Sequence, residues 1–513
     1  MVEHFWKIWP WILAIVDLLA ATAVTIHAVL WKRDARSVIA WVGLAWLAPL
    51  LGSLAYVALG INRIERRAVA LRVRRRRNRR HLFPFARKTA TVPGSTSGPP
   101  DTSGTSDSVP CGPQASADAR GSSPEFEQLH AAFTGLARLG RQLTSRDLLP
   151  GNRVVALRDG DEAYPAMLRA LDGAQRSIAL ASYIFDSDRV GSRFREALVR
   201  ARRRGVLVRV LVDDVGAHYS RPNMVRLLQQ DDVPTAAFLP VRLPRISRYT
   251  NLRNHRKLLV VDGKIGFTGG TNIREGHQLN LQPSSPVQCL HFQLEGPVVG
   301  HLQETFAVDW EFTTGESLRG SAWFPDLECV GPVWARGIAS GPDEDFETLN
   351  DTLLGALSVA RESVRIVCPY FVPSMPLIHA LTVTAMRGVD VEITIPERTN
   401  IPFVAWAALG QAGQYLRKGC RVLLSPTPFD HTKLMVVDRQ WVLIGSTNWD
   451  ARSLRLNFEF NVECYDRDLA SQLHEVAGEK MRHARELTWD ELQRQSLALR
   501  LRNGLSRLLT PYL

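Results

Sequence analysis

DHTKLMVVDRQWVLIGSTNWDARSLRLNFEFN, residues 430–461, is the stretch around which the chain is organised. An earlier stretch, NHRKLLVVDGKIGFTGGTN at residues 254–272, repeats its key residues at the same offsets, 176 positions upstream (431 − 255). The matching pairs are His255 and His431, Lys257 and Lys433, Asp262 and Asp438, Gly269 and Gly445, and Asn272 and Asn448. A fixed-offset match at two distant places indicates duplicated structural units.

Each copy has the pattern of a β-hairpin, because an apolar run precedes Asp-Gly or Asp-Arg and a second apolar run follows. Side chains alternate between the faces of a strand, so His255 and Lys257 are predicted to share one face, as are His431 and Lys433. An imidazole near neutrality can attack phosphorus or move a proton, and an ammonium beside it can hold a phosphate oxygen. Asn272 and Asn448 would donate their side-chain amides to the same anion.

A single HxKxxxxD pattern is a weak signal, because it would more often mark an ordinary hairpin. Two copies that share the GxxN ending favour a functional interpretation. At these residues the sequence resembles the phospholipase D superfamily, whose signature is two such motifs in one active site. More narrowly it is similar to bacterial cardiolipin synthases, through SYIFDSDRVG (182–191), CPYFVPSMPLIHAL (368–381), RGVDVEITIP (387–396) and GSTNWDARSLRLNFE (445–459).

The resemblance implies a catalytic set of His255, Lys257, Asp262, His431, Lys433 and Asp438, supported by Asn272, Asn448, Glu459, Gly269 and Gly445. One histidine would attack phosphorus while the other protonates the leaving alkoxide, and superfamily precedent favours His255 as the nucleophile. The lysines and asparagines would stabilise the phosphoryl oxygens. The residues alone do not order the two histidines, and no metal or cofactor is expected.

Carboxylates are expected to have supporting roles. Asp262 and Asp438 point away from the His/Lys face by parity, so we expect them to cap the turn or pair with a buried base. A carboxylate usually orients a catalytic histidine through its other nitrogen. Glu459 matches that family position in the second lobe, whereas the first lobe has Cys289 there. This departure would weaken imidazole orientation in the first lobe unless Glu275 or a backbone carbonyl substitutes.

The charge distribution argues against a nucleic-acid enzyme. Sixteen of the 63 Lys/Arg and four of the 51 Asp/Glu precede residue 89, which accounts for the whole net charge of +12 and leaves 47 residues of each sign in the rest. A nucleic-acid channel would normally leave a positive footprint on the catalytic part. The six cysteines have no CxxC spacing and are expected to be reduced thiols.

Two apolar segments near the start of the chain predict a two-helix transmembrane hairpin. Residues 9–31 contain Asp17 and His27, whereas residues 38–61 carry no charge and are the stronger candidate. A signal peptide is the alternative for the first segment, but its apolar run is long and a second span follows at once. The cluster RVRRRRNRR at residues 72–80 predicts that both termini are cytoplasmic, and it could equally bind anionic lipid.

The expected fold class is α/β. Two phospholipase D-like lobes, each a sheet flanked by helices and related by pseudo-two-fold duplication, would follow the membrane hairpin. The predicted domains are residues 1–88 with the hairpin and its basic flank, a disordered linker at 89–126, a first lobe at 127–335 and a second at 336–513. Tyr183 and Tyr370 fall at matching strand ends, where packing is favoured over substrate contact. The amphipathic stretch after Trp489 either docks on the lobes or lies on a membrane.

The leading hypothesis is a multi-pass enzyme of the bacterial cell membrane with cytoplasmic lobes. It would make cardiolipin from two phosphatidylglycerol molecules and release glycerol. The alternative is a phospholipase D-type hydrolase or a nuclease of the same superfamily, and a non-catalytic scaffold is disfavoured by two complete His/Lys sets. The expected partners are a phospholipid substrate and the membrane, with no nucleic acid, while the oligomeric state is left open.

The arginine cluster leads to a topology prediction. A reporter fused at Ser108, in the predicted linker, should report the cytoplasm, because flanking positive charge is retained on that side. A periplasmic signal from the same fusion would contradict this orientation.

Overall fold

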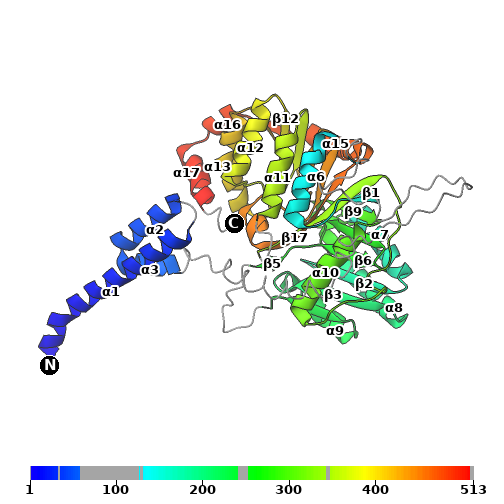
Figure 1. Ribbon diagram of the computed structural model, residues 1–513, viewed down its shortest axis with the longest axis horizontal. Helices are drawn as coiled ribbons and strands as arrows, with labels where there is room; N and C mark the ends of the chain where they lie inside the picture. The colour runs from blue at the N-terminus through cyan, green and yellow to red at the C-terminus, as the bar shows by residue number, and fades with distance from the viewer. Residues whose placement is uncertain are drawn as a thin grey trace, which may run out of the picture. The chain divides into compact units, whose positions relative to one another are not determined.

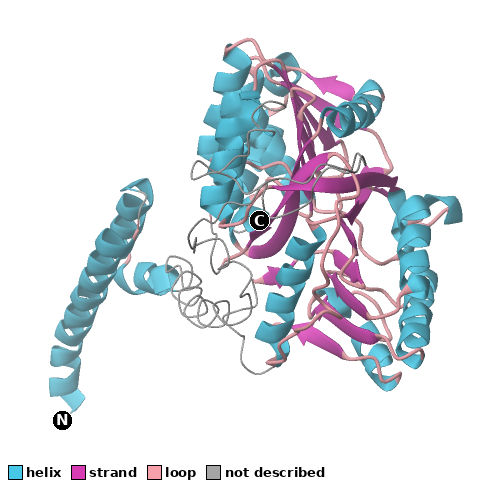
Figure 2. Cartoon of the chain, turned by 45° about the vertical axis from the view of Figure 1, so that its right-hand side comes forward, coloured by secondary structure: helices cyan, strands magenta, loops and turns pink. Residues whose placement is uncertain are grey.

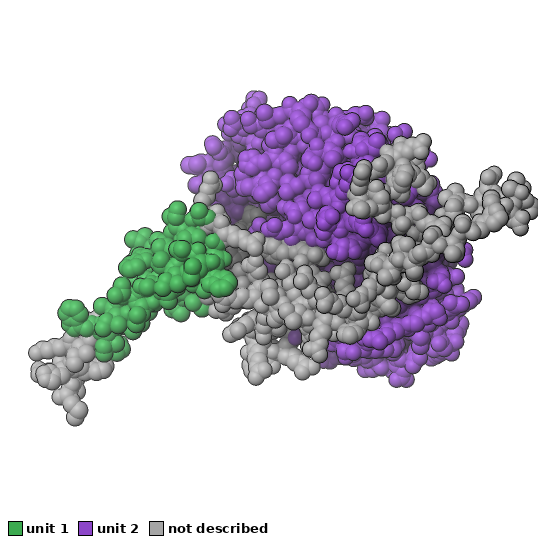
Figure 3. Space-filling model, in the orientation of Figure 1, with its two compact units in different colours: residues 1–70 green, residues 71–513 purple. Residues whose placement is uncertain are grey.

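The computed structural model describes residues 2–32, 35–57, 126, 131–240, 252–342 and 347–508. The chain divides into two compact units, residues 1–70 and 71–513 (Figure 3). The predicted basic flank and the predicted linker at 89–126 lie outside the described residues, apart from Phe126, which is buried.

The first unit contains one long helix and a broken one. Helix α1 (Val2–Trp31) includes a stretch, Trp11–Trp31, that is long and apolar enough to cross a membrane, and it is the one such helix in the described part of the chain. The segment that the sequence favoured is split into α2 (Ala35–Leu47) and α3 (Pro49–Ala55). Pro49 disfavours helical geometry at the preceding residue, and Ala48 has φ −141° and ψ 75°. The two-span prediction is therefore supported only for its first segment.

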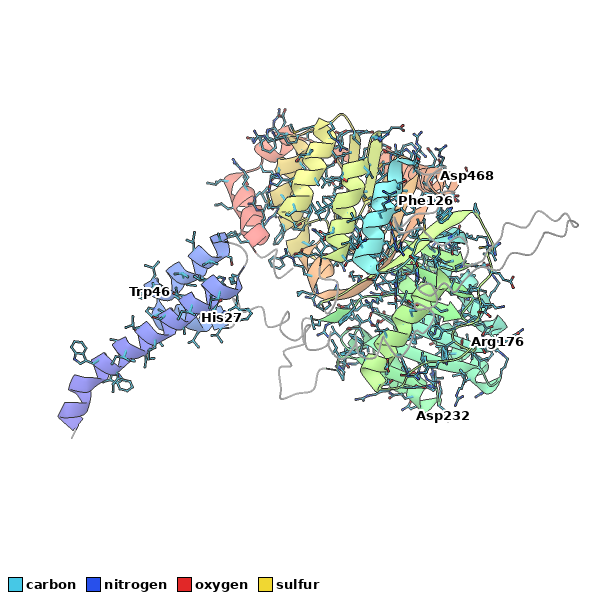
Figure 4. All side chains as sticks on the ribbon, viewed as in Figure 1. His27, Trp46, Phe126, Arg176, Asp232 and Asp468 are labelled. Carbon is cyan, nitrogen blue, oxygen red and sulfur yellow. The ribbon has the colours of Figure 1, made fainter. Side chains whose placement is uncertain are left out.

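The broken arm nevertheless folds back on α1. Small residues of α1 pack with Ala45 and Tyr56 in a common cluster. The Tyr56 hydroxyl lies 2.7 Å from His27 Nδ1, and Trp46 Nε1 donates to Thr25 Oγ1 at 3.0 Å (Figure 4 labels His27 and Trp46). These polar contacts join the two arms within an otherwise apolar helical hairpin.

The second unit is built on one continuous sheet with two lobes in which the strands follow the same order. From the centre outward, the first lobe runs β1-β9-β7-β6-β2-β3-β4 and the second runs β10-β17-β16-β15-β11-β12-β13-β18. The lobes join where β1 and β10 pair antiparallel, with Leu149 opposite Ala335. This order confirms the predicted duplication of an α/β lobe, and Figure 2 shows the strands lying between helices on either side.

The strands of the first lobe are β1 (Leu149–Arg158), β2 (Ser177–Ser182), β3 (Leu207–Asp213), β4 (Thr235–Phe238), β6 (Leu258–Val261), β7 (Ile265–Gly269) and β9 (Leu290–Glu295). Those of the second are β10 (Val333–Ser340), β11 (Ser363–Val367), β12 (Asp390–Pro396), β13 (Arg421–Ser425), β15 (Leu434–Val437), β16 (Trp441–Gly445), β17 (Asn457–Tyr465) and β18 (Arg485–Leu487). Strand β2 is buried along its whole length, as its unbroken apolar run predicts for a sheet covered on both faces.

Helices cover both faces of the sheet (Figure 1). The first lobe has α7 (Asp159–Gly173), α8 (Arg189–Arg203), α9 (Met224–Gln230) and α10 (Val299–Thr314). The second has α11 (Thr348–Val359), α12 (Met375–Met386), α13 (Pro402–Leu416), α14 (Ala451–Arg455), α15 (Arg467–Arg482), α16 (Trp489–Gln493) and α17 (Leu497–Leu508). Helix α6 (Thr134–Thr144) precedes β1 in the chain, yet it packs on α11 in the core of the second lobe.

The cysteines only partly follow the expectation of reduced thiols. Cys289, Cys368, Cys420 and Cys464 are free and buried, whereas Cys329 is disulfide-bonded, contrary to the prediction. That prediction rested on the lack of CxxC spacing, which carries no information about pairs that are distant in sequence.

A buried ion pair ties the central strands of the second lobe to α6. Arg336 on β10 donates through Nε to Glu463 on β17 at 2.6 Å, and neither side chain has any exposed surface. Glu463 also accepts from Trp441 Nε1 at 3.1 Å, while Arg336 Nη2 donates to the carbonyl of Ala137 on α6 at 2.9 Å. Loss of one partner would leave the other charge buried and unpaired.

We therefore predict that Arg336→Met lowers the free energy of unfolding by about 3–5 kcal/mol, because Glu463 would remain buried without its counter-ion. The matched control is Arg200→Met, which breaks an ion pair with Asp172 whose side chains are half exposed. That change should cost less than about 1 kcal/mol. Denaturant titration of the detergent-solubilised protein, followed by tryptophan fluorescence, measures both, and equal losses would contradict the prediction.

Candidate active site

Both repeated motifs form the predicted strand–turn–strand units. Strands β6 and β7 pair antiparallel in the first lobe, and β15 and β16 do so in the second. The turn residues have positive φ angles, 53° and 65° for Asp262 and Gly263 and 51° for both Asp438 and Arg439. Each turn has three residues, because Val261 pairs with Ile265 and Val437 pairs with Trp441, and the first two residues of each turn are the ones with positive φ.

The histidine and lysine of each motif lie just before the strand rather than on it. Strand β6 begins at Leu258 and β15 at Leu434, so the prediction that these residues belong to the strand itself is wrong. These residues lie outside the hairpin strands because their backbone pairs with the other lobe. The His255 amide donates to the carbonyl of Phe458 at 2.9 Å, and the His431 amide donates to that of Gln288 at 2.7 Å.

Two short parallel strand pairs surround these bonds. Strand β5 (Arg253–Asn254) of the first lobe pairs with β17 of the second, and β14 (Phe429–Asp430) of the second pairs with β8 (Val287–Gln288) of the first. Each lobe thus holds the backbone that carries the other lobe's histidine.

This exchange brings the two motifs into one site. The rings of His255 and His431 lie 6.5 Å apart between centroids and almost perpendicular, at 82°. Lys257 Nζ donates to the carbonyl of His255 at 2.8 Å, and Lys433 Nζ donates to that of His431 at 2.7 Å. Because an ammonium has three donors, each lysine retains capacity for an anion between the rings.

Glu459 orients the histidine of the opposite lobe. Its carboxylate lies 3.0 Å from His255 Nδ1 and also accepts from the Ser446 hydroxyl at 2.5 Å. A carboxylate is acceptor-only, so the Nδ1 proton stays on His255 and the Nε2 lone pair is available to the site. We expected each carboxylate to orient the histidine of its own lobe. This expectation is wrong, because Glu459 of the second lobe contacts His255 of the first lobe.

Cys289 occupies the position that matches Glu459, as predicted. Gly269 pairs with His291 and Gly445 pairs with Asn461, so Cys289 and Glu459 each lie two residues before the paired position. Cys289 Sγ is 3.3 Å from the carbonyl oxygen of His431, and it donates there. The histidine that lacks a supporting carboxylate is therefore His431 of the second lobe rather than His255.

A backbone carbonyl takes the place of that carboxylate. His431 Nδ1 lies 3.0 Å from the carbonyl oxygen of Gly270, which was one of the two expected substitutes. The other, Glu275, instead forms an ion pair with Arg189. A Cβ atom at residue 270 would lie 2.5 Å from Cys289 Sγ, so glycine and cysteine fit together at this position.

Asp262 and Asp438 have matching structural roles away from the histidines. The Asp262 carboxylate accepts from the three backbone amides of residues 175–177, which lead into β2. The Asp438 carboxylate accepts from those of residues 361–363, which lead into β11. Each aspartate therefore caps the start of the neighbouring strand, rather than its own turn or a buried base.

The two motif glycines allow close approach of the backbone. At Gly269, φ is 149° and a Cβ atom would lie 2.8 Å from the Cα of His291. At Gly445, φ is 154° and a Cβ atom would lie 2.5 Å from the carbonyl oxygen of Phe460. Any larger residue would push the hairpin away from its neighbouring strand.

The motif asparagines are both buried, and each forms a hydrogen bond within its own lobe. Asn272 accepts from the Ile184 amide through Oδ1 at 3.3 Å. Asn448 donates from Nδ2 to the Ser453 hydroxyl at 3.3 Å. Their contact with a substrate anion stays a prediction.

Burial sets the protonation of the site. It lowers the pKa of His255 to about 4 and that of His431 far below its usual range. It also lowers the pKa of Lys257 to about 7 and that of Lys433. Burial opposes the charge of Glu459, but the neighbouring His255 and Lys257 hold its pKa below the usual value. Neutral imidazoles thus face each other beside an anionic carboxylate, and an arriving phosphodiester would favour the charged lysines.

Two tyrosines line the site, although packing was the favoured interpretation from sequence. The Tyr183 ring lies 5.1 Å from that of His255, with Lys257 Nζ 5.6 Å from its centroid. The Tyr370 ring lies 6.2 Å from that of His431. Their matching places at the two strand ends were the signal for this role.

Further residues of the site were missed. Arg256 forms a buried ion pair with Asp309 at 2.6 Å and donates from Nε to the carbonyl of Glu459 at 2.9 Å. Comparison of the two repeats does not identify Arg256, because the matching position in the second copy is Thr432. The buried ring of His277 lies 6.2 Å from that of His431, in a segment where the first copy is longer than the second.

Comparison with known proteins agrees with this geometry. The family description "Cardiolipin synthase, PLD-like domain" matches residues 167–283 and 353–481, one segment in each lobe. The major cardiolipin synthase ClsA of Bacillus subtilis (strain 168) is 33% identical over 365 residues, which cover 71% of this chain and 76% of that protein. This chain belongs to the cardiolipin synthase family. A cardiolipin synthase of Staphylococcus aureus (strain Mu50) is 32% identical over 357 residues, covering 69% of this chain and 72% of that protein.

A solved structure supports the family fold. The phosphatidylserine synthase of Haemophilus influenzae Rd KW20 superposes with a TM-score of 0.58 at 15% identity, covering 74% of this chain and all of that one. At this identity the likeness concerns the fold alone, and it agrees with the two-lobed architecture of this cardiolipin synthase family member.

The buried histidines predict acid sensitivity of the fold. The pKa of His291 is lowered by burial to about 3, compared with about 6.5 in an unfolded chain. As pH falls below about 6.5, the unfolded chain gains a proton that the folded chain does not, so this histidine makes stability decrease on acidification. His291→Gln should therefore flatten the decrease in denaturant midpoint between pH 7.5 and pH 5.

The exposed His483→Gln variant is the control and should keep the parent slope. Burial raises the pKa of Asp213 and of Asp450 to about 6, and these groups act in the opposite direction. The difference between variant and parent isolates the contribution of His291, and an unchanged slope in His291→Gln would contradict the prediction.

Proposed function

We propose that this chain transfers a phosphatidyl group from one phosphatidylglycerol to the free hydroxyl of a second, forming cardiolipin and releasing glycerol through a phosphohistidine. The observation that carries the proposal is the facing pair of imidazoles, of which only His255 is backed by a carboxylate. A carboxylate behind the ring favours the positive charge that a phosphohistidine carries, so the asymmetry supports His255 as the nucleophile and His431 as the acid and base.

In the first half-reaction, His255 Nε2 attacks the phosphorus of the donor lipid. The bond from phosphorus to the glycerol headgroup oxygen breaks, and protonated His431 donates its proton to that oxygen. The negative phosphodiester favours the imidazolium form of His431, whose pKa burial lowers in the free site. Glycerol then leaves as a neutral alcohol.

In the second half-reaction, the headgroup hydroxyl of another phosphatidylglycerol gives its proton to His431. Its oxygen attacks phosphorus, and the bond from phosphorus to His255 breaks. Atoms and protons balance, since two phosphatidylglycerols give one cardiolipin and one glycerol. Lys257 and Lys433 would hold the phosphoryl oxygens in both steps, and Asn272 and Asn448 would add amide donors.

A hydrolase or a nuclease remains the second candidate. A lipid acceptor is favoured by the apolar stretch of α1, because it would keep the chain at a bilayer where lipid hydroxyls are concentrated. The aromatic walls of Tyr183 and Tyr370 would also shield the phosphohistidine from water. We propose the same cytoplasmic orientation of the lobes as the sequence predicts.

The catalytic roles predict the effect of removing either imidazole. His255→Ala should abolish cardiolipin formation, and His431→Ala should lower the rate by roughly 10²–10⁴-fold. The double variant should be no worse than His255→Ala, because the two act as a unit. His483→Ala serves as the surface control, and near-normal turnover in either single variant would contradict a shared centre.

The products identify the acceptor. The full chain in micelles that contain phosphatidylglycerol should yield cardiolipin and free glycerol in equal amounts. Activity should survive a chelator, because two lysines neutralise the phosphoryl charge and no group of three or more metal-ligating side chains occurs in the described part of the chain. Phosphatidic acid alone would identify a hydrolase, and cleavage of DNA with lipid untouched would refute a lipid substrate.

A further inference from the structure

Helix α17 is oriented with its polar side toward the protein. Its buried residues are Asn503 and Ser506, exposed by 3% and 4%. Four of its five leucines face outward, and these four, Leu497, Leu501, Leu505 and Leu508, are exposed by 71%, 56%, 63% and 70%. A surface helix normally buries its apolar stripe against the core, so this arrangement is the reverse of the usual one.

The four leucines form a single stripe. They recur at i, i+4, i+8 and i+11, a spacing that places them on one side of a helix. Arg500 and Arg507 lie beside the stripe on the helix surface and are exposed. We call these four leucines the leucine face of α17.

Contacts on the polar side hold α17 in this orientation. The helix packs against α13 so closely that a Cβ atom at Gly410 would lie 2.7 Å from the carbonyl oxygen of Asn503. The Arg502 guanidinium lies 4.5 Å from the ring centroid of Trp406 on α13, and Asn503 Nδ2 donates to Gln495 Oε1 at 3.1 Å. Figure 1 shows α17 beside α13 at the outer edge of the second lobe.

The start of α13 connects this region with the active site. Phe403 is 51% exposed, and its ring lies 5.1 Å from that of Trp406. Just before α13, Asn400 accepts a hydrogen bond from the hydroxyl of Tyr370, whose ring faces His431. A surface that contacts the leucine face and Phe403 would therefore adjoin the wall of the catalytic site.

We propose that the leucine face of α17, together with Phe403, docks on the surface of an anionic lipid bilayer and inserts its apolar side chains between the headgroups. Leucines on one side with arginines beside them match a helix that lies in the plane of a membrane interface. The arginines would complement anionic lipid, and the apolar stretch of α1 would keep the chain near a bilayer. Through Asn400 and Tyr370 the docked face would present lipid headgroups to the histidines, a step that rests on the proposed function.

Depth-dependent quenching tests the docking without any measurement of activity. A fluorophore is attached at Leu505→Cys in the full chain, reconstituted in vesicles of phosphatidylglycerol and phosphatidylcholine with brominated acyl chains. The four free cysteines among the described residues are buried, which favours labelling at position 505. The control site is Met386→Cys at the end of α12, which is exposed by 66%. We expect strong quenching at position 505 and little at position 386.

Equal, weak quenching at both sites would overturn the proposal. Efficient disulfide formation between the introduced thiols of two Leu505→Cys chains would also overturn it, because the leucine face would then be an interface between protomers. A crosslink from the thiol at position 505 to an engineered cysteine on α1 or α2, with no quenching, would assign the face to the chain's own membrane unit and overturn the proposal as well.

Turnover tests the consequence for catalysis. The variant Leu501→Glu/Leu505→Glu should lose at least tenfold in rate on phosphatidylglycerol in vesicles, but keep its rate on short-chain phosphatidylglycerol below its micelle concentration. Met386→Glu should behave as the parent with both substrates. Loss on both substrates by the double variant would mean a structural role and overturn the proposal. Inactivity of the parent on every lipid would reject the proposed function while leaving the quenching result valid.

Discussion

Each motif histidine donates its backbone amide to a carbonyl of the opposite lobe, and the candidate site depends on this exchange. The two bonds, from His255 to Phe458 and from His431 to Gln288, sit at the ends of short parallel strand pairs that cross between the lobes. Without them, His255 and His431 would belong to two separate hairpins. With them, each lobe supplies half of the site and holds the other half in position, so neither lobe alone could contain a complete centre.

The same exchange explains why Glu459 supports a histidine that is not its own. Strand β17 carries both Phe458, which fixes the backbone of His255, and Glu459, which fixes its ring. One strand therefore sets both the position and the tautomer of the imidazole. On the other side, Gly270 supplies a neutral carbonyl to His431, and Cys289 is a buried thiol whose pKa burial raises to about 11. The duplicated lobes have thus diverged into one histidine with an anionic support and one with a neutral support, which is a suitable division for a nucleophile and an acid.

The two helices that are suited to contact lipid lie outside the repeated motifs. Helix α1 has the length and composition of a membrane span, and α17 presents leucines outward from the second lobe. Together they would bring an α/β scaffold to a bilayer, where both the donor and the acceptor of a phosphatidyl transfer are found.

The sequence by itself determined the duplication, the hairpins and the identity of the paired His, Lys, Asp, Gly and Asn residues, because these follow from local spacing and turn chemistry. The resemblance of longer stretches around the motifs indicated the family. It also placed Cys289 in register with Glu459, which the strand pairing confirms. Only the tertiary structure decided that Glu459 serves His255, that Asp262 and Asp438 cap neighbouring strands, and that α17 faces its leucines outward. Each of these depends on a contact between residues far apart in the chain, and a periodic pattern states which side of a helix is apolar but not which side the protein covers.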